Sequence, residues 1–386
     1  MTFDLEKARA AAARAIIPLK PAGRDTTAAQ NFLFSAKREV RADALPPYYL
    51  VRFLLIDLLG FRNLGRFEKV DWSVPVEFKG RAFLIEHRKF GLGVFIGGAP
   101  DDPDDAREIA RLIHRGVKAA APYFTWLAEE AAKASALNVV NRARTLFERF
   151  EFFAGLYDAR VTEAERRKDE SIRTDLGPTA WTVSWPSFDL RKEGDHYAIS
   201  TIESFFSWTE HVFILIAILR GTHVTGEDVR QLAQANWDTK FKAALDIVDP
   251  KTKAFFDDLV QVRRQVRNFV AHGSFGKEGE AFQIHSSAGA VPMRMLDERR
   301  GARFRLGAGA GYADDKAIQL LRDFVDHLWD GDRAPARIYI QDWELPLILT
   351  YAKDGTYAQC MTSVEEMEAF THHLSEEMDR HANMDF

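Results

Sequence analysis

The chain of 386 residues contains one cysteine, Cys360. A single cysteine cannot form an intramolecular disulfide bond, and it excludes a zinc site built from several thiolates. No other cluster with metal-ligand spacing is recognisable, so we expect neither a metal nor another cofactor. This cysteine usage fits a reducing compartment, and we expect a cytoplasmic protein.

The sequence also lacks an excess of basic residues and an apolar run of membrane length. The formal net charge of -5 argues against a protein that coats nucleic acid, although it is compatible with a local basic site. The most apolar stretch, residues 48–61, is too short to span a bilayer and contains Arg52 and Asp57. Asp4 and Glu6 stand where a signal peptide would be basic, so we expect no membrane partner.

The composition is that of a soluble globular protein, with 46% hydrophobic and 28% charged residues. The patterning predicts a mainly α protein with α+β parts, in which a helical bundle is flanked by small α+β segments. We expect an α+β domain at residues 1–121 and a helical domain at 122–330 with a hairpin insertion at about 274–311. Residues 331–386 are expected to form a β-hairpin and a terminal helix.

The spacing of apolar residues predicts individual elements. In the first domain we expect helices within 28–40, 47–61 and 99–116, and a meander of strands within 71–98. In the second domain we expect one long helix within 122–170, or two helices broken near Gly155. A loop held down by Trp181 and Trp185 should follow, and then a central buried helix at 196–220.

Further helices are expected at about 226–236, at 238–248, from 250 to the hairpin insertion, and at 312–331. Residues 336–361 suggest strands with Asp354-Gly355 as a hairpin turn. The terminal helix should begin at Ser363 with a capping box completed by Glu366.

The sequence "RRQVRNFVAHGSFG" at residues 263–276 contains Arg267, Asn268 and His272, with Gly273 directly after them. Phe255, Leu259, Val262, Val266 and Phe269 give the preceding segment one apolar stripe. On a straight helix Arg267 and His272 would be separated by about 140°. They could share one phosphate only if the helix ends or distorts near Ala271, or if a second chain completes the site.

An ordinary helix end also accounts for this pattern. Gly273 is a natural stop, and basic side chains in the last turn are favoured by the helix dipole. The protein would then be a scaffold, and Asn268 would be a solvated polar residue.

The Arg-Asn pair, three residues and His-Gly at the end of a striped helix resemble the HEPN family and its R-x(4–6)-H motif. The resemblance covers roughly residues 190–330. It implies a helical bundle and a metal-independent endoribonuclease that acts as a homodimer on RNA. Arg267 would clamp the phosphate, His272 would transfer a proton and Asn268 would orient them. It also implies a role as a toxin or in antiviral defence, with an antitoxin or other regulatory partner.

Two further sets of residues fit this interpretation. Ser200, Glu203, Ser207 and Glu210 form a polar stripe on the central helix, where a carboxylate could hold Arg267 or the stripe could simply face water. An RNA-binding track would use the basic residues near the motif, unless they are solvated partners of Asp297 and Glu298. These basic residues are Arg263, Arg264, Lys277, Arg294, Arg299, Arg300, Arg303 and Arg305.

Other patterns receive structural interpretations. The glycine-rich residues 306–315 lack the Walker spacing and lysine, and are expected to form a turn. Asp71, Glu77 and Lys79 loosely match a nuclease pattern, but alternating charges on a solvent face explain them better. His372 and His373 are adjacent and do not form a chelating pair, and His211 is expected to be a hydrogen-bonded helix residue. The alternative function is a non-catalytic HEPN-like module that binds RNA, nucleotide or protein.

Overall fold

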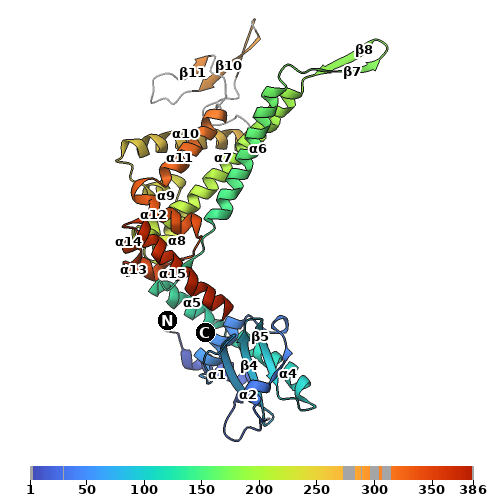
Figure 1. Ribbon diagram of the computed structural model, residues 1–386, viewed down its shortest axis with the longest axis vertical. Coiled ribbons are helices and arrows are strands. Elements are labelled where there is room, and N and C mark those ends of the chain that lie inside the picture. Colours follow the sequence, from blue (N-terminus) through green and yellow to red (C-terminus); the bar gives the residue numbers. More distant parts are fainter. Residues whose placement is uncertain are drawn as a thin grey trace. The chain divides into compact units, whose positions relative to one another are not determined.

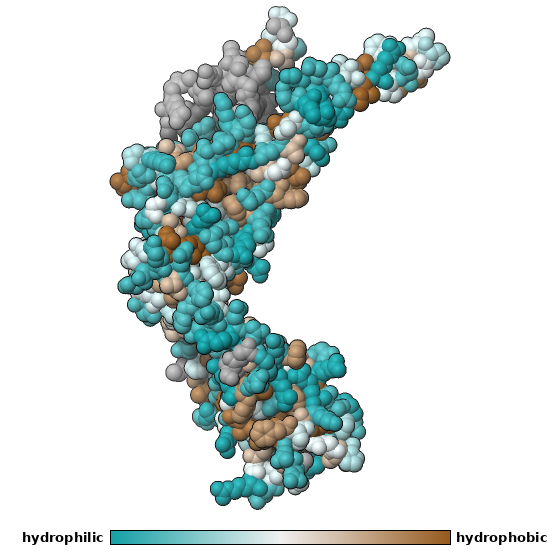
Figure 2. Space-filling model, in the orientation of Figure 1, coloured by the Kyte–Doolittle hydropathy of each residue, from teal (hydrophilic) through white to brown (hydrophobic). Residues whose placement is uncertain are grey.

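The structure is a computed structural model that describes residues 3–28, 30–272, 283–287, 289–295, 304–306 and 314–384. The chain forms two compact units, Met1–Ala134 with His372–Phe386, and Ser135–Thr371. It is mainly helical, with a five-stranded antiparallel sheet near the N-terminus and small hairpins, as the sequence predicts (Figure 1). Hydrophilic residues cover most of the visible surface of each unit (Figure 2).

The first unit is built on the predicted meander. Its sheet has the strand order β1-β3-β4-β5-β2. Gly80 and Gly91 adopt positive φ values at the two turns of the meander, which favours glycine there. The strands are β1 (Lys20–Pro21), β2 (Lys37–Val40), β3 (Val70–Phe78), β4 (Arg81–Arg88) and β5 (Gly91–Ile96).

The prediction of a helix within 28–40 is wrong for most of this range. Only α2 (Phe32–Ser35) is helical, and β2 follows it at once. β2 pairs with the outer edge of β5, where it satisfies backbone groups that would otherwise face solvent. Long-range strand pairing therefore overrides the local helical spacing.

Helices cover the sheet of the first unit. The helical segments expected around 47–61 and 99–116 are confirmed, the first with a π-helical second half. The helical elements are α1 (Leu5–Ile16), the 3-10 turn η1 (Ala42–Ala44), α3 (Tyr48–Arg52), the π-helix η2 (Phe53–Leu58), α4 (Asp102–Ala119) and α5 (Ala121–Ala134). Residues from His372 onward of α15 (Val364–Asn383) also belong to this unit.

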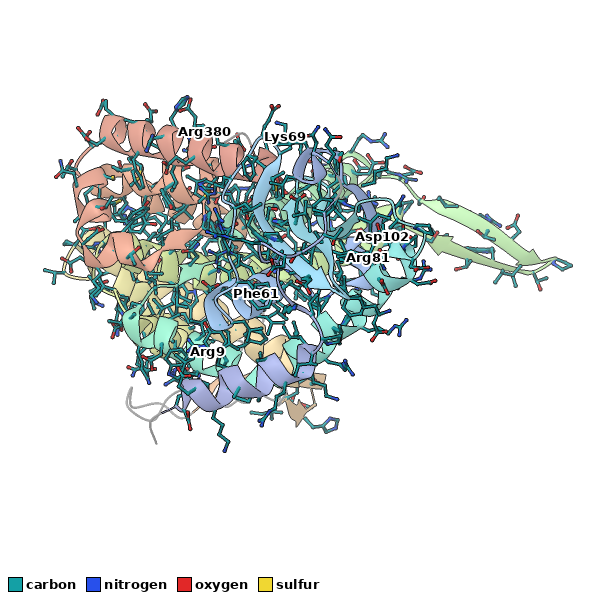
Figure 3. All side chains as sticks on the ribbon, turned by 90° about the horizontal axis from the view of Figure 1, so that it is seen from below. Arg9, Phe61, Lys69, Arg81, Asp102 and Arg380 are labelled. Atoms are coloured by element: carbon teal, nitrogen blue, oxygen red, sulfur yellow. The ribbon has the colours of Figure 1, made fainter. Side chains whose placement is uncertain are left out.

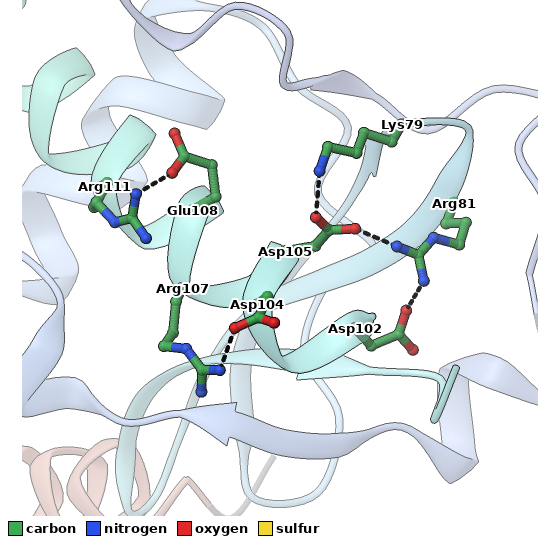
Figure 4. Close-up of polar contacts among 8 residues, drawn as sticks. All are labelled: Lys79, Arg81, Asp102, Asp104, Asp105, Arg107, Glu108 and Arg111. Carbon is green, nitrogen blue, oxygen red and sulfur yellow. Dashed lines mark hydrogen bonds and ion pairs between the residues drawn. The ribbon is translucent and has the colours of Figure 1, made fainter. Parts of the chain in front are cut away.

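A buried ion network joins α4 to the sheet (Figures 3 and 4). The guanidinium of Arg81 on β4 donates a hydrogen bond of 2.6 Å to Asp102 and another to Asp105. Both aspartates are buried, at 4% and 3% exposure. Lys79 adds a 2.7 Å contact to Asp105, so one cation-rich turn holds the first turn of α4 in place.

The second unit begins with β6 (Asn138–Val139) and a long antiparallel helix pair. α6 (Ala143–Arg166) continues through Gly155 without a break, and α5 is a separate helix, so the prediction of a single helix or a break near Gly155 is wrong. Gly155 meets open space, and a glycine whose backbone stays helical lowers helix stability without ending the helix. α7 (Pro186–Leu219) starts ten residues earlier than the expected segment.

The prediction of a loop at 170–195 is also wrong. β7 (Ile172–Gly177) and β8 (Ala180–Ser184) form a hairpin at the end of the α6–α7 pair, and Pro186 already lies in the first turn of α7. Trp181 and Trp185 are 57% and 45% exposed, so they do not hold the segment against the protein. Pro178 in the turn and Pro186 directly after the hairpin hid the alternation of its residues.

α7 is the central buried helix that the sequence predicts. Of the described helices, it alone is long and apolar enough to cross a membrane, but 72% of its most apolar window is buried inside the protein. α8 (Gly226–Gln234), α9 (Trp237–Ala244), α10 (Pro250–His272) and α11 (Asp314–Leu328) also agree with the expected helices. The bundle shares one aromatic core of Phe205, Trp208, Phe213, Trp237, Phe241 and Phe324.

The hairpin insertion is described in part. β9 (Gln283–Ser286), β10 (Gly289–Met295) and β11 (Phe304–Leu306) form an antiparallel sheet of order β11-β10-β9. The glycine-rich turn expected after residue 306 lies outside the described residues until Asp314, where α11 begins.

The strands and the hairpin turn expected within 336–361 are wrong. Short helices fill this segment, and only β12 (Leu347–Ile348) pairs with β6, over two residues. Tyr339 and Tyr357 are fully buried and their hydroxyls lie 3.0 Å apart, so tertiary packing explains the alternation that resembled a strand. Gly355 adopts a positive φ between two helices. The elements are η4 (Gly331–Arg333), α12 (Ala334–Arg337), the π-helix η5 (Ile338–Asp342), α13 (Leu349–Lys353) and α14 (Thr356–Cys360).

The start of α15 agrees with the sequence. The backbone N–H of Glu366 donates to Ser363 Oγ at 3.2 Å, which is the expected cap of this helix.

Candidate functional site

α10 carries the motif and packs as its apolar stripe predicts. Leu259, Val262 and Val266 are buried, and Phe255 is half-buried against Phe324 of α11. These contacts fix the rotation of α10 within the bundle. The positions of all other residues on the helix follow from that rotation.

A carboxylate of α7 meets α10 one turn before the motif. Glu210 Oε1 accepts a hydrogen bond of 3.1 Å from Arg263 Nη2, and Glu210 Oε2 accepts one of 3.0 Å from Lys240 Nζ of α9. The Lys240 side chain is only 7% exposed, whereas Arg263 and Glu210 are about one third exposed. Two cations therefore share one carboxylate, and the cluster keeps a net positive charge.

Two aromatic rings lie close to the guanidinium of Arg263. The Arg263 guanidinium carbon lies 5.8 Å from the ring centroid of Phe206 and 5.9 Å from that of Trp237. Trp237 is fully buried, and its indole N–H donates to Thr209 Oγ1 at 3.0 Å. Rings in this position attract a cation and restrict its movement, so Arg263 is held rigidly on α10.

Helix geometry relates the motif to this cluster. Four residues beyond Arg263, the position of Arg267 is rotated by only about 40° and advanced by about 6 Å. The position of His272 is nine residues beyond Arg263 and is rotated by about 180°. α10 is helical through His272, so both positions lie on the same helix. Arg267 and His272 therefore lie on opposite sides of the buried stripe.

Within one chain, α10 does not bring the three motif positions to one point. Asn268 falls about 140° from Arg263, on the side away from the buried stripe. The side chains of Arg267, Asn268 and His272 lie outside the described residues, as does Gly273. Of the two routes to a shared phosphate, a site completed by a second chain does not require α10 to distort.

The predicted polar stripe of α7 is only partly engaged. Glu210 makes the contacts given above, and Ser200 is half-buried with its hydroxyl donating to the carbonyl of His196. Glu203 and Ser207 are exposed. The described contacts of Glu210 go to Arg263 and Lys240, so this carboxylate supports the turn before the motif.

The predicted basic track is described at few of its positions. Arg263 is bound to Glu210, and Arg264 is exposed on α10. The backbone register of β10 and β11 sets the position of Arg294 opposite that of Arg305. The remaining members, Lys277, Arg299, Arg300 and Arg303, lie outside the described residues.

His211 and the charged residues of the meander, which the sequence analysis explains structurally, make structural contacts. The backbone N–H of Arg142 donates to His211 Nε2 at 2.9 Å, so this histidine is neutral, and burial lowers its pKa. Glu77 pairs with Lys20, Lys79 with Asp105, and Asp71 with Arg66 and His87. Where the structure describes the chain, no group of three histidine, cysteine or acidic residues could hold a metal ion.

A cavity of about 580 Å³ at the other end of α10 was not found from the sequence. It is lined by Lys251, His327, Asp330, Arg337 and Gln341, among others. His327 Nε2 lies 2.8 Å from the hydroxyl of Thr252, which itself donates to Asp249, so His327 donates through Nε2. Burial lowers the pKa of His327, and the neutral ring serves the packing of α10 on α11.

Lys240 and Trp237 could not be recognised from the sequence as neighbours of Glu210 and Arg263. Both lie on a short helix whose pairing with α7 is a long-range contact. Comparison with known proteins adds no relative, since no family model, no curated protein and no solved structure matches the chain.

Proposed function

We propose that this protein is a HEPN-like, metal-independent endoribonuclease that works as a homodimer. The substrate is RNA, which supplies its own nucleophile through the ribose 2′-OH. The reaction leaves a 2′,3′-cyclic phosphate on one product and a 5′-OH on the other. The cytoplasm is the compartment of action, and a toxin or antiviral role with a regulatory partner such as an antitoxin is part of the same proposal.

Each motif residue has a chemical task in this proposal. His272 accepts or returns the proton of the reacting hydroxyls, because an imidazole titrates near neutral pH. Arg267 clamps the phosphate and stabilises the charge of the pentacoordinate transition state. Asn268 orients the phosphate or the imidazole by hydrogen bonding. No metal ion has to be bound for any of these steps.

One observation carries the proposal: the motif ends a bundle helix that is held by a carboxylate of the long neighbouring helix. Glu210 fixes Arg263, and Arg267 is the next position on nearly the same side of α10. Lys240 and Arg263 leave net positive charge beside the motif, which favours a phosphate there.

The test is cleavage of RNA in the presence of EDTA. The protein should cleave RNA with products that carry cyclic phosphates, and both Arg267→Ala and His272→Ala should abolish cleavage without loss of the fold. Arg230→Ala and His373→Ala are matched controls, because these residues lie on the exposed faces of α8 and α15. Cleavage that survives both motif substitutions would overturn the assignment of the site.

The second candidate is a non-catalytic module that binds RNA, a nucleotide or a partner protein. The separation of about 140° between Arg267 and His272 on a continuous helix favours it. RNA binding that is lost in Arg267→Ala, without any cleavage by the wild-type protein, would support this candidate. The same assay therefore distinguishes the two.

A further inference from the structure

The hairpin of β7 and β8 extends from the end of the α6–α7 pair (Figure 1). Every residue of β7 is exposed, and only Val183 of β8 is half-buried. Within the described part of the chain, the two strands form a sheet of their own, so both outer edges lack a strand partner. An isolated two-stranded hairpin is at best marginally stable in water.

The hairpin also exposes apolar side chains that a solvated arm would not need. Ile172 and Leu176 of β7 are 44% and 69% exposed, and Trp181 of β8 is 57% exposed. Figure 2 shows hydrophobic residues along this arm. Exposed apolar residues beside an open strand edge are typical of a surface that pairs with another chain.

The sequence of β7 is complementary to itself in one antiparallel register. When two copies of β7 pair about a two-fold axis at Thr174, Arg173 lies opposite Asp175 of the second copy, and this happens twice. Leu176 lies at a bulge of β7, between the pairs Asp175–Trp181 and Gly177–Ala180, so the two charge pairs define this register. Opposite charges at facing positions stabilise a sheet.

The neighbouring registers lack this complementarity. Antiparallel pairing allows shifts of the axis by whole residues, because facing residues must share a side of the sheet. An axis at Arg173 sets two arginines opposite each other, and an axis at Asp175 does the same with two aspartates. Like charges at facing positions are destabilising, so the axis at Thr174 is favoured.

We propose that β7 is a self-association element that pairs with β7 of a second copy of this chain. The two hairpins then form a four-stranded sheet with the order β8-β7-β7-β8, and the β7 edges are no longer open. This inference does not rest on RNA cleavage, and its test measures mass and cross-linking. The paired strands are short, so we expect a dimer whose population depends on concentration.

Charge reversal tests the register. The molar mass of the full chain is measured by light scattering or sedimentation over a concentration series. Arg173→Asp sets two acidic residues opposite each other, and Asp175→Arg sets two basic residues opposite each other, so each variant alone should be more monomeric than the wild type. The double variant should associate like the wild type, since opposite charges face each other again.

A mixture of the two single variants provides a second test of the register. In a mixed pair the facing residues at 173 and 175 have opposite charges, so the mixture should recover the association that each variant alone has lost. Arg230→Asp is the matched control, because it reverses one charge of an exposed ion pair on α8 and should leave the mass unchanged. Recovery in the mixture cannot result from misfolding of the single variants.

Cross-linking tests the position of the axis. Thr174→Cys brings two thiols to facing positions, with Cα atoms about 4.5–5.5 Å apart, which suits a disulfide bond. Thr182→Cys, on the strand opposite Thr174, is the control, since β8 strands would be about 14 Å apart across the sheet. The native Cys360 is buried.

We expect a disulfide-linked dimer of Thr174→Cys and none of Thr182→Cys. A wild-type chain that stays monomeric throughout the series would overturn the proposal, and so would single variants that associate like the wild type. If Asp175→Arg instead increased affinity for single-stranded RNA and left the mass unchanged, the hairpin would be an RNA-binding arm and the proposal would again be overturned.

Discussion

Glu210 of α7 and Arg263 of α10 are joined by a 3.1 Å hydrogen bond where the two helices meet. The second carboxylate oxygen of Glu210 holds the buried Lys240, so this one residue ties α7, α9 and α10 together. Arg263 lies one turn before Arg267. The orientation of the motif end of α10 therefore depends on a carboxylate more than fifty residues away in the chain.

Glu210→Gln should lower the free energy of unfolding by roughly 2 kcal/mol, because the buried Lys240 loses its carboxylate partner. This lies below the usual cost of breaking a fully buried pair, since Glu210 is itself about one third exposed. Denaturant unfolding measures the change. Glu203→Gln, an exposed residue two turns away on the same helix, should leave the unfolding free energy unchanged.

Arg81→Ala should destabilise the first unit by about 3 kcal/mol, because it removes the guanidinium partner of two buried carboxylates. Lys79 still contacts Asp105, but Asp102 then has only backbone donors. Thermal unfolding followed by circular dichroism would detect the loss. Arg107→Ala on α4 is a fair comparison (Figure 4), since its partners Asp104 and Glu39 are 84% and 31% exposed, and we expect little change in the unfolding temperature.

Elements with one strong local pattern could be predicted from the sequence. The apolar stripe of α10 and the apolar length of α7 both indicate a helix with a buried face, and Leu259 and Val262 are buried as expected. The meander was predicted from alternating apolar residues on both sides of Gly80, with Gly80 and Gly91 as turn residues. In each case the residues that decide the structure lie within a few turns of one another.

Elements decided by distant partners could not be predicted. β2 is a strand because β5 offers it an edge, and the segment around Tyr339 is helical because it packs in the second unit with Tyr357. The contacts of Glu210 could not be predicted for the same reason. Its polar stripe was visible in the sequence, but the choice of Arg263 and Lys240 as partners depends on how three helices pack.

The second unit should lose stability as the pH falls below about 6.5, the ordinary pKa of histidine. Burial lowers the pKa of His211, so the unfolded chain binds a proton in this range before the folded chain does. Protonation of Nε2 would also break the bond from the Arg142 backbone N–H. Stability measured across this range should depend less on pH in His211→Gln, whose amide oxygen can accept the same bond; an unchanged pH dependence would contradict the assignment.

Arg267→Ala and His272→Ala should complement each other if one site takes its arginine and histidine from different chains. α10 is continuous through His272, so a single chain holds the two positions about 140° apart. When the two inactive variants are mixed equally and allowed to exchange subunits, half of the dimers are mixed, and each mixed dimer contains one site with both residues intact. RNA cleavage should then return to about a quarter of the wild-type rate. If one chain supplied both residues of a site, the mixture would stay inactive, so the rate of the mixture decides between a site within one chain and a site shared by two.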